Sequence, residues 1–247
     1  MVGLGTVVNV VAILVGSTLG VWFGHRLPER TTRTVTDTLG LVVLVIGGLN
    51  VVALKDPDYV AAVGGGFTLL IVLGALLIGG ITGSLLRIED RLASIGGWLQ
   101  NRFVPDDAPS SQARFIEGFL DASLLFCIGP LAVLGALSDG LGRGIDQLVL
   151  KSVLDGFAAL AFAATLGWGV AASALSVGVF QGLLTVLAVL LGALVPAAVV
   201  ASITATGGVL LLGVGLRLLG VRSIAVADML PALIVAPVLT AIVSALT

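Results

Sequence analysis

Long apolar runs alternate with short polar segments along almost the whole chain. A helix that crosses the roughly 30 Å hydrocarbon core of a bilayer needs about 20 mostly apolar residues. The predicted spans are 3–24, 37–54, 60–86, 115–138, 147–172, 177–201, 204–219 and 225–246. We therefore predict an all-α fold, a polytopic transmembrane helix bundle of eight spans, with seven as the alternative count.

The composition indicates the same environment. Hydrophobic residues make up 58% of the chain and charged residues only 11%, and the mean hydropathy is +1.19. A water-soluble domain typically has about a quarter charged residues, so the expected partner of most of the surface is the lipid bilayer. A net charge of −2 with scattered arginines argues against nucleic acid as a partner.

The longest polar interruption lies at 87–114. Leu92, Ile95, Trp98 and Leu99 recur there at helical spacing among charged residues, which is typical of an amphipathic helix on the membrane surface followed by a linker. We predict one transmembrane domain over 1–247. Its parts are repeat 1 (1–86), this surface segment (87–114), spans four and five (115–172) and repeat 2 (177–247).

A shift of 168 residues superposes two copies of the pattern G-x3-P-x7-T-x-T-x-G-x6-G, which begin at Gly24 and Gly192. The copies lie five spans apart, and this odd number makes them antiparallel. The pattern thus predicts an inverted repeat of spans 1–3 and 6–8, as recurs in secondary transporters. Chance matching in a glycine-rich apolar chain is the alternative.

Basic residues fall mainly in one set of loops. Loops after odd-numbered spans hold nine Lys or Arg residues, and loops after even-numbered spans hold three. Because cytoplasmic loops accumulate Lys and Arg, we predict that both termini lie outside. The first run has no basic leader and no cleavage site, so we interpret it as a retained span.

Glycines at four-residue spacing line two of the predicted spans. Gly16, Gly20 and Gly24 lie on one face of the first span, and Gly79 and Gly83 on one face of the third. Such faces let helix backbones approach closely. They favour a homo-oligomer, although packing within a single bundle would use them equally well.

Several polar residues lie in or at the edge of the predicted spans. Asn9 could hydrogen-bond a neighbouring helix or coordinate a solute. Glu117 and Asp121 share a helix face, where repulsion between like charges favours uptake of a proton or a monovalent cation. The alternative places both carboxylates at the level of the headgroups. Asp228 precedes Pro231 at the start of the last span, where capping of that helix is the expected role.

Two further segments could form a site. Gly129 and Pro130 interrupt the fourth span, and carbonyl groups freed by a proline are tolerated in a membrane only where they meet protein, water or a ligand. A simple kink is the alternative. Lys151 and Asp155 are four residues apart with Ser152 between them. They predict either an interfacial ion pair or part of a solute or proton site.

Four stretches carry a resemblance to a known family. They are Asn9 to Gly24, FCIGPLAVLGALSDGLG, KSVLDGF with TLGWGV and the following Gln181-Gly182, and GGVLLLGVGLRLLG with DMLPAL. The chain resembles the domain of unknown function 554 family, the YqgA/YdfK-like uncharacterised bacterial membrane proteins, over nearly its whole length. It differs from the family's pattern at Ser84 and Asp228. The resemblance implies a fold and a bacterial inner or plasma membrane, and it implies no substrate.

The leading functional hypothesis is a transporter of a small solute or ion, with proton or cation coupling through carboxylates. A channel is the nearest variant, and a membrane scaffold or sensor acting through protein partners is the alternative. We predict no enzyme and no cofactor: His25 and Cys127 are the sole His and Cys and cannot form a Cys/His metal site within one chain. Asp121 and Asp155 show no recognisable protease motif. The candidate substrate- or ion-binding residues are Asn9, Glu117, Asp121, Gly129, Pro130, Lys151, Ser152, Asp155, Gln181 and Asp228.

Overall fold

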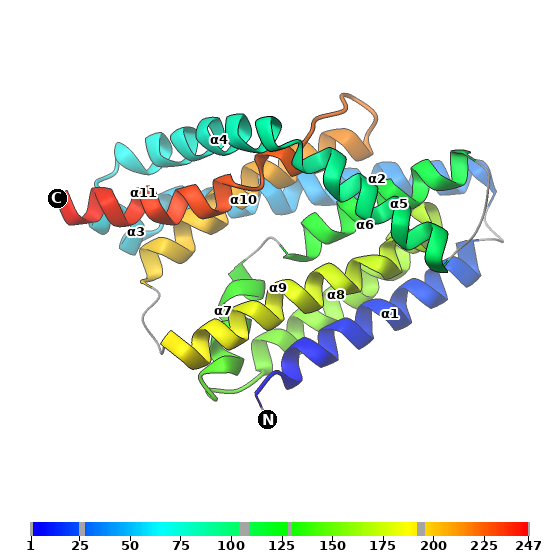
Figure 1. Cartoon of the computed structure of the whole chain (residues 1–247), viewed down its shortest axis with the longest axis horizontal. Helices are drawn as coiled ribbons and strands as arrows, with labels where there is room; N and C mark the ends of the chain where they lie inside the picture. Colours follow the sequence, from blue (N-terminus) through cyan, green and yellow to red (C-terminus); the bar gives the residue numbers. More distant parts are fainter. Residues whose placement is uncertain (1, 25–27, 104–108, 128–129, 192–195, 247) are drawn as a thin grey trace. The chain divides into compact units, whose positions relative to one another are not determined.

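The computed structural model describes residues 2–24, 28–103, 109–127, 130–191 and 196–246, which are helical throughout most of their length and contain no strand (Figure 1). The elements are α1 (Leu4–Gly24), α2 (Glu29–Val51), η1 (Val52–Lys55), α3 (Pro57–Val63), α4 (Phe67–Leu86), α5 (Ile88–Phe103), α6 (Pro109–Cys127), α7 (Pro130–Gly140), α8 (Asp146–Leu166), α9 (Gly169–Leu191), α10 (Ala197–Leu218), η2 (Ala227–Met229) and α11 (Ala232–Leu246). Within these ranges seven helices are long and apolar enough to cross a membrane, and the bent pair α6–α7 raises the number to eight. The predicted polytopic all-α fold is confirmed.

Glycine and proline move several helix ends away from the predicted positions. The predicted span 60–86 is divided into α3 and α4, because Gly64 adopts a φ of 80° and ends α3. The α8 helix ends at Leu166, before Gly167 with a φ of 74°, so the predicted span 147–172 is too long. Residues 197–201, assigned to the sixth span, begin α10 directly after Pro196.

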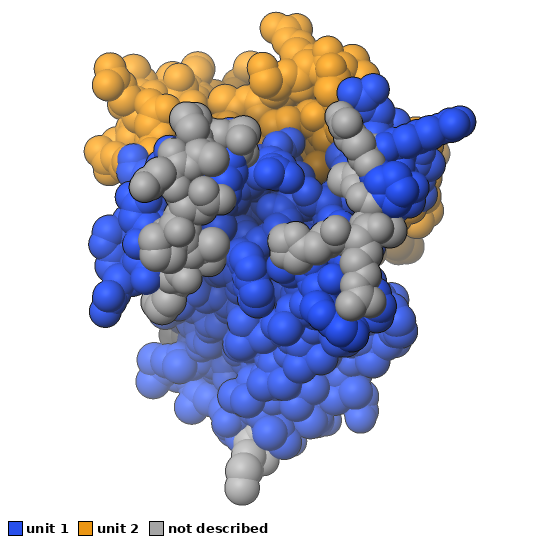
Figure 2. Space-filling view, turned by 90° about the vertical axis from the view of Figure 1, so that its right-hand side faces the viewer, with its two compact units in different colours: residues 1–39, 92–127, 131–193 blue, residues 40–91, 128–130, 194–247 orange. Residues whose placement is uncertain are grey.

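The described residues form two compact units, which Figure 2 colours separately. Unit 1 comprises residues 1–39, 92–127 and 131–193, and unit 2 comprises residues 40–91, 128–130 and 194–247. The α1, α6, α7, α8 and α9 helices thus belong to unit 1, whereas α4, α10 and α11 belong to unit 2. The packing of each unit is described by itself.

In unit 1 the glycine face of α1 lies against α8. A Cβ added at Gly16, Gly20 or Gly24 would come closer than 3.0 Å to a backbone oxygen of α8, at positions 156, 160 and 164 respectively. The two helices therefore run parallel, with backbones in direct contact. This face of α1, on which self-association was predicted, is occupied within the chain.

The bent pair α6–α7 follows α9 along its length. Near the start of α9, a Cβ at Gly169 would meet the carbonyl oxygen of Phe115, and farther along Thr185 donates to the carbonyl oxygen of Ala136 at 3.3 Å. The α6 and α7 helices are inclined to each other by 63°. Contact from one end of α9 to the other is the arrangement of a broken span, whereas a re-entrant loop would turn back. If the pair α6–α7 is counted as one span, the number of spans is the predicted eight.

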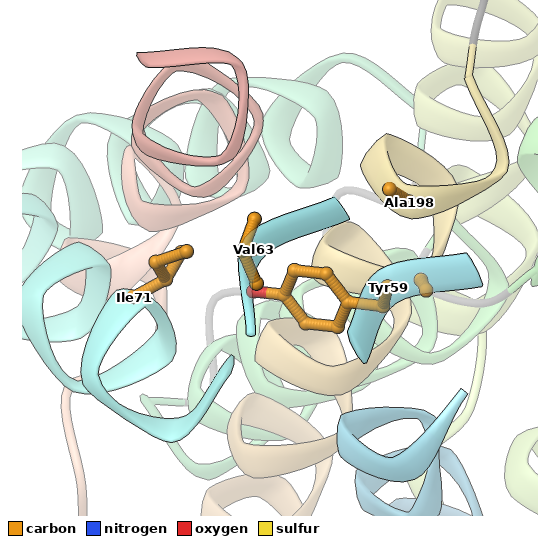
Figure 3. Close-up of a cluster of buried hydrophobic side chains, with 5 residues drawn as sticks. Tyr59, Val63, Ile71 and Ala198 are labelled. Atoms are coloured by element: carbon orange, nitrogen blue, oxygen red, sulfur yellow. The ribbon is translucent and has the colours of Figure 1, made fainter. Parts of the chain in front are cut away.

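In unit 2 the other glycine face, on α4, packs against the start of α11. A Cβ at Gly79 would clash with Ala232, and one at Gly83 would clash with the backbone of Asp228, so the helices run antiparallel. An apolar cluster of Tyr59, Val63, Ile71, Ala198 and Ala201 joins α3, α4 and α10 (Figure 3). Burial raises the pKa of the Tyr59 phenol, which keeps it neutral among these apolar side chains.

The α2 and α10 helices also cross through glycines within unit 2. A Cβ at Gly47 would lie 2.9 Å from the carbonyl oxygen of Gly208, and one at Gly215 would lie 3.1 Å from the carbonyl oxygen of Gly40. As residue numbers rise along one helix they fall along the other. The crossing is therefore antiparallel.

Candidate functional site

An ion pair lies inside the helix packing of unit 1. Lys151 and Asp155 are one turn apart on α8, and their side chains are only 8% and 10% exposed. The Lys151 ammonium donates to Oδ2 of Asp155. Asp155 is the tenth of the 21 residues of α8, so this ion pair does not lie at a helix end. The sequence pattern predicted the pair, and the structure places it in the interior of the bundle.

Two amide side chains complete this cluster from other helices. Asn9 of α1 donates from Nδ2 to Oδ2 of Asp155 at 3.0 Å and to Oε1 of Gln181, on α9, at 3.3 Å. Both amide side chains are fully buried. We call Asn9, Lys151, Asp155 and Gln181 the buried polar cluster. It joins α1 to the consecutive helices α8 and α9, which lie far from α1 in the sequence.

Two atoms of the cluster are left without a hydrogen-bond partner among the described residues. They are Oδ1 of Asn9, an acceptor, and Nε2 of Gln181, a donor. The carboxylate of Asp155 can only accept, which fixes the orientation of the Asn9 amide and in turn that of Gln181. A buried polar atom without a partner costs about 1–3 kcal/mol. The cluster therefore has one acceptor and one donor available to a bound molecule.

Ser152 lies beside the ion pair but serves its own helix. Its hydroxyl donates to the carbonyl oxygen of Leu148, one turn earlier, at 2.6 Å. The side chain is buried, and this bond satisfies its donor. Ser152 thus lies beside the cluster, outside its network of hydrogen bonds.

The remaining predicted residues belong to other elements. Asp121 is fully buried in α6, and Glu117, one turn earlier, is half-buried. Gly129 lies outside the described residues, and Pro130 is the first residue of α7. Asp228 belongs to unit 2, so it is no member of the cluster in unit 1.

Asp228 acts as a helix cap, although not for the helix that was predicted. Its Oδ1 accepts a hydrogen bond of 2.8 Å from the backbone N–H of Glu89, in the first turn of α5. Glu89 in turn accepts from the backbone N–H of Ala227 at 3.0 Å and pairs with Arg217 at 3.1 Å. The prediction that Asp228 caps the last helix is therefore wrong. The close packing of α4 on η2 brings it to α5 instead.

The sequence interpretation missed Asp139, near the end of α7. Its two carboxylate oxygens accept hydrogen bonds from the backbone N–H groups of Gly3, at 2.9 Å, and Gly5, at 3.0 Å. These groups lie at the first turn of α1, where N–H donors have no partner within the helix. In the sequence, the sole local sign of this role is an acidic residue at the end of an apolar run. Its partners cannot be recognised locally, because they lie more than 130 residues away.

We expect Asp139→Ala to destabilise the protein by about 1–2 kcal/mol, because two N–H groups at a helix start lose their acceptor. Asp139→Asn keeps one acceptor oxygen and should cost less. Thermal unfolding of the purified variants measures both effects. Equal stability of Asp139→Ala and the unmodified protein would show that the cap contributes nothing.

An apolar groove of about 580 Å³ lies in unit 1, and its lining includes residues next to the cluster residues along α1 and α9. Its lining includes Val10 and Leu14 of α1 and Leu175 and Gly178 of α9. Val10 follows Asn9 in the chain, and Gly178 lies one turn before Gln181. The same two helices therefore hold the two amides of the cluster and border the groove. Across the described residues, no three His, Cys, Asp or Glu side chains come together as a metal site would require.

Comparison with known proteins shows similarity along nearly the whole chain. Residues 4–241 match the family described as "Protein of unknown function (DUF554)". An "Uncharacterized protein YqgA" of Escherichia coli strain K12 is 32% identical over 238 residues, 96% of each chain. An "Uncharacterized membrane protein YdfK" of Bacillus subtilis strain 168 is 29% identical over 241 residues, 98% of this chain and 97% of that protein. No solved structure matches.

Proposed function

The chain belongs to the DUF554 family, and from its buried polar cluster we propose that it is a membrane transporter of a small solute or ion. The observation that carries the proposal is the Lys151–Asp155 pair, which lies inside the bundle with an unpartnered donor and acceptor beside it. Ionisable residues within membrane helices are expensive to maintain, and they commonly mark substrate or ion pathways.

The predicted inverted repeat supports the proposal through helix positions. The α2 helix begins at residue 29 and α10 at residue 197, which is the same shift of 168 residues as in the sequence pattern. Equal helix limits are expected of two copies of one structural unit.

Contacts within each unit add to this support. The shift places Gly40 on Gly208 and Gly47 on Gly215, and each of these glycines packs against the counterpart of the other. In unit 1, a Cβ at Gly178 would lie 3.4 Å from Val10, its own counterpart under the same shift. Reciprocal contacts of this kind are typical of a twofold axis. Two inverted copies that exchange conformations would give alternating access.

We assign the protein to the bacterial inner or plasma membrane with both termini outside. The loops and helix ends after odd-numbered spans carry nine basic residues in the sequence, and those after even-numbered spans carry three, of which Lys151 lies within α8. A short epitope tag at either end should be cleaved by protease added to intact cells or spheroplasts. Cleavage that requires permeabilised membranes would show that the termini lie inside, contrary to this assignment.

The transporter proposal is tested by ligand binding and by flux. Thermal unfolding of the purified protein is followed against ions, amino acids and organic acids, because a ligand at about one hundred times its dissociation constant adds roughly 2.7 kcal/mol to the folded state. The matched control is the double variant Lys151→Met/Asp155→Leu, which removes both charges together. We expect at least one compound to stabilise the unmodified protein but not the double variant, and to show saturable flux in liposomes.

Other outcomes separate the alternatives. Flux without saturation or coupling would indicate a channel. Absence of any stabilising compound and any flux would sink the transporter proposal and favour a scaffold or sensor.

A further inference from the structure

We propose that the buried polar cluster binds a small zwitterion of the α-amino-acid type. The carboxylate of this ligand accepts hydrogen bonds from Lys151 and Gln181. Its ammonium group donates to Asp155 and Asn9. The inference rests on the proposed transport function and names the class of solute.

The first reason is charge. Lys151 and Asp155 are both buried, and each neutralises the other. A solute that separates them must give each ion a new partner, because an unpaired charge in the interior is strongly unfavourable. An anion alone would leave Asp155 unpaired, and a cation alone would leave Lys151 unpaired. A zwitterion supplies both partners and leaves the net charge of the site unchanged.

The second reason is the pattern of available hydrogen-bonding groups. The unpartnered atoms of the cluster are one donor, Nε2 of Gln181, and one acceptor, Oδ1 of Asn9. A carboxylate only accepts and an ammonium group only donates, so a zwitterion complements one of these atoms with each of its ends. A solute with donors alone or acceptors alone would leave the other atom unsatisfied.

The helices that hold the two amides add no charge to the cluster. The α1 and α9 helices, which hold the two amides, have no ionisable side chain in their sequences. From the other helices of unit 1, Asp121 of α6 is fully buried and Glu117 is half-buried, and the Asp139 carboxylate of α7 is engaged by Gly3 and Gly5.

Space for a small solute lies between the same helices. The apolar groove of about 580 Å³ runs beside the cluster along α1 and α9, and its volume is within the usual range of ligand pockets. Separation of α1 from α9 would join the groove to the cluster. The groove is lined by small and apolar side chains, which suits an amino acid with an apolar side chain.

The test compares matched ligands by thermal unfolding and by isothermal titration. The twenty standard amino acids are screened first. The best of them is then compared with its amide, which keeps only the positive charge, with its deamino acid, which keeps only the negative charge, and with its N-trimethyl derivative, which has no N–H donor. We expect each of the three analogues to bind at least tenfold more weakly than the amino acid.

Two variants connect this preference to the cluster. Lys151→Met/Asp155→Leu should remain folded and lose binding of the amino acid. Gln181→Met keeps the ion pair, removes the Nε2 donor together with the Oε1 that accepts from Asn9, and should weaken binding about tenfold. Gly182→Ala, the neighbouring substitution at a site with no atom within 4 Å of the added Cβ, serves as the control and should bind normally.

The outcomes distinguish this inference from the transport proposal. An amide or deamino acid that binds as tightly as the amino acid would overturn the proposal that the ligand is a zwitterion. A different solute or ion that stabilises the unmodified protein but not the double variant would overturn it as well, and transport would stand. If no compound binds and none is moved in liposomes, both proposals fail.

Discussion

Lys151→Met is expected to lower the free energy of unfolding by about 3–5 kcal/mol, because it leaves the buried carboxylate of Asp155 without its cation. Met has nearly the length of Lys and fills the same space, so the loss reports charge rather than volume. Asp155→Leu should cost a similar amount, since it strands the Lys151 ammonium. Thermal or denaturant unfolding in detergent measures both effects.

The double variant Lys151→Met/Asp155→Leu distinguishes a paired charge from a merely buried side chain. Replacing a whole buried ion pair with apolar residues of similar volume is often neutral or stabilising. We therefore expect the double variant to recover most of the stability that each single variant loses. Losses that simply add would contradict a direct pairing of Lys151 and Asp155.

The triple variant Gly16→Ala/Gly20→Ala/Gly24→Ala should separate α1 from α8. Each added methyl group would meet a backbone oxygen of α8 closer than 3.0 Å, and a backbone cannot move aside as a side chain can. Overpacking typically costs about 1–3 kcal/mol at one site. The combined cost of three such sites on one face should therefore exceed the cost of losing any single helix cap. We expect loss of the folded protein, measured as the monodisperse fraction after extraction and as the unfolding midpoint.

Gly48→Ala and Gly182→Ala provide the control for this prediction. Both are helical glycines with no atom within 4 Å of the added Cβ, and they should leave stability unchanged or raise it slightly through helix propensity. A triple variant as stable as these controls would show that α1 and α8 do not pack through this face.

Most of the helical architecture follows from local patterns. Apolar runs of about 20 residues predict membrane helices, because each backbone polar group in a bilayer must be satisfied within the segment. Spacing along one helix likewise places Lys151 and Asp155 on one face, and the helical spacing from Leu92 to Leu99 anticipates α5. Such features depend on a few neighbouring residues, so the sequence determines them.

Helix limits depend partly on backbone conformations that a hydrophobicity pattern does not contain. The sequence TLGWGV reads as a continuous apolar helix, yet Gly167 adopts a positive φ and separates α8 from α9. Gly64 ends α3 in the same way. Glycine allows such a turn without requiring it, and the surrounding packing decides whether the turn occurs.

Tertiary structure alone decided that Asn9 and Gln181 join Lys151 and Asp155 in the cluster. Asn9 reaches Asp155 across 146 residues and Gln181 across 172, and the close approach of glycine-faced α1 to α8 brings these partners together. Long-range packing likewise places Asp139 at the start of α1 and Asp228 at the start of α5. A polar residue in a membrane helix signals that some partner exists, because it is costly to bury alone. Which partner it meets depends on which helices touch and in what register, and these are properties of the whole packed bundle.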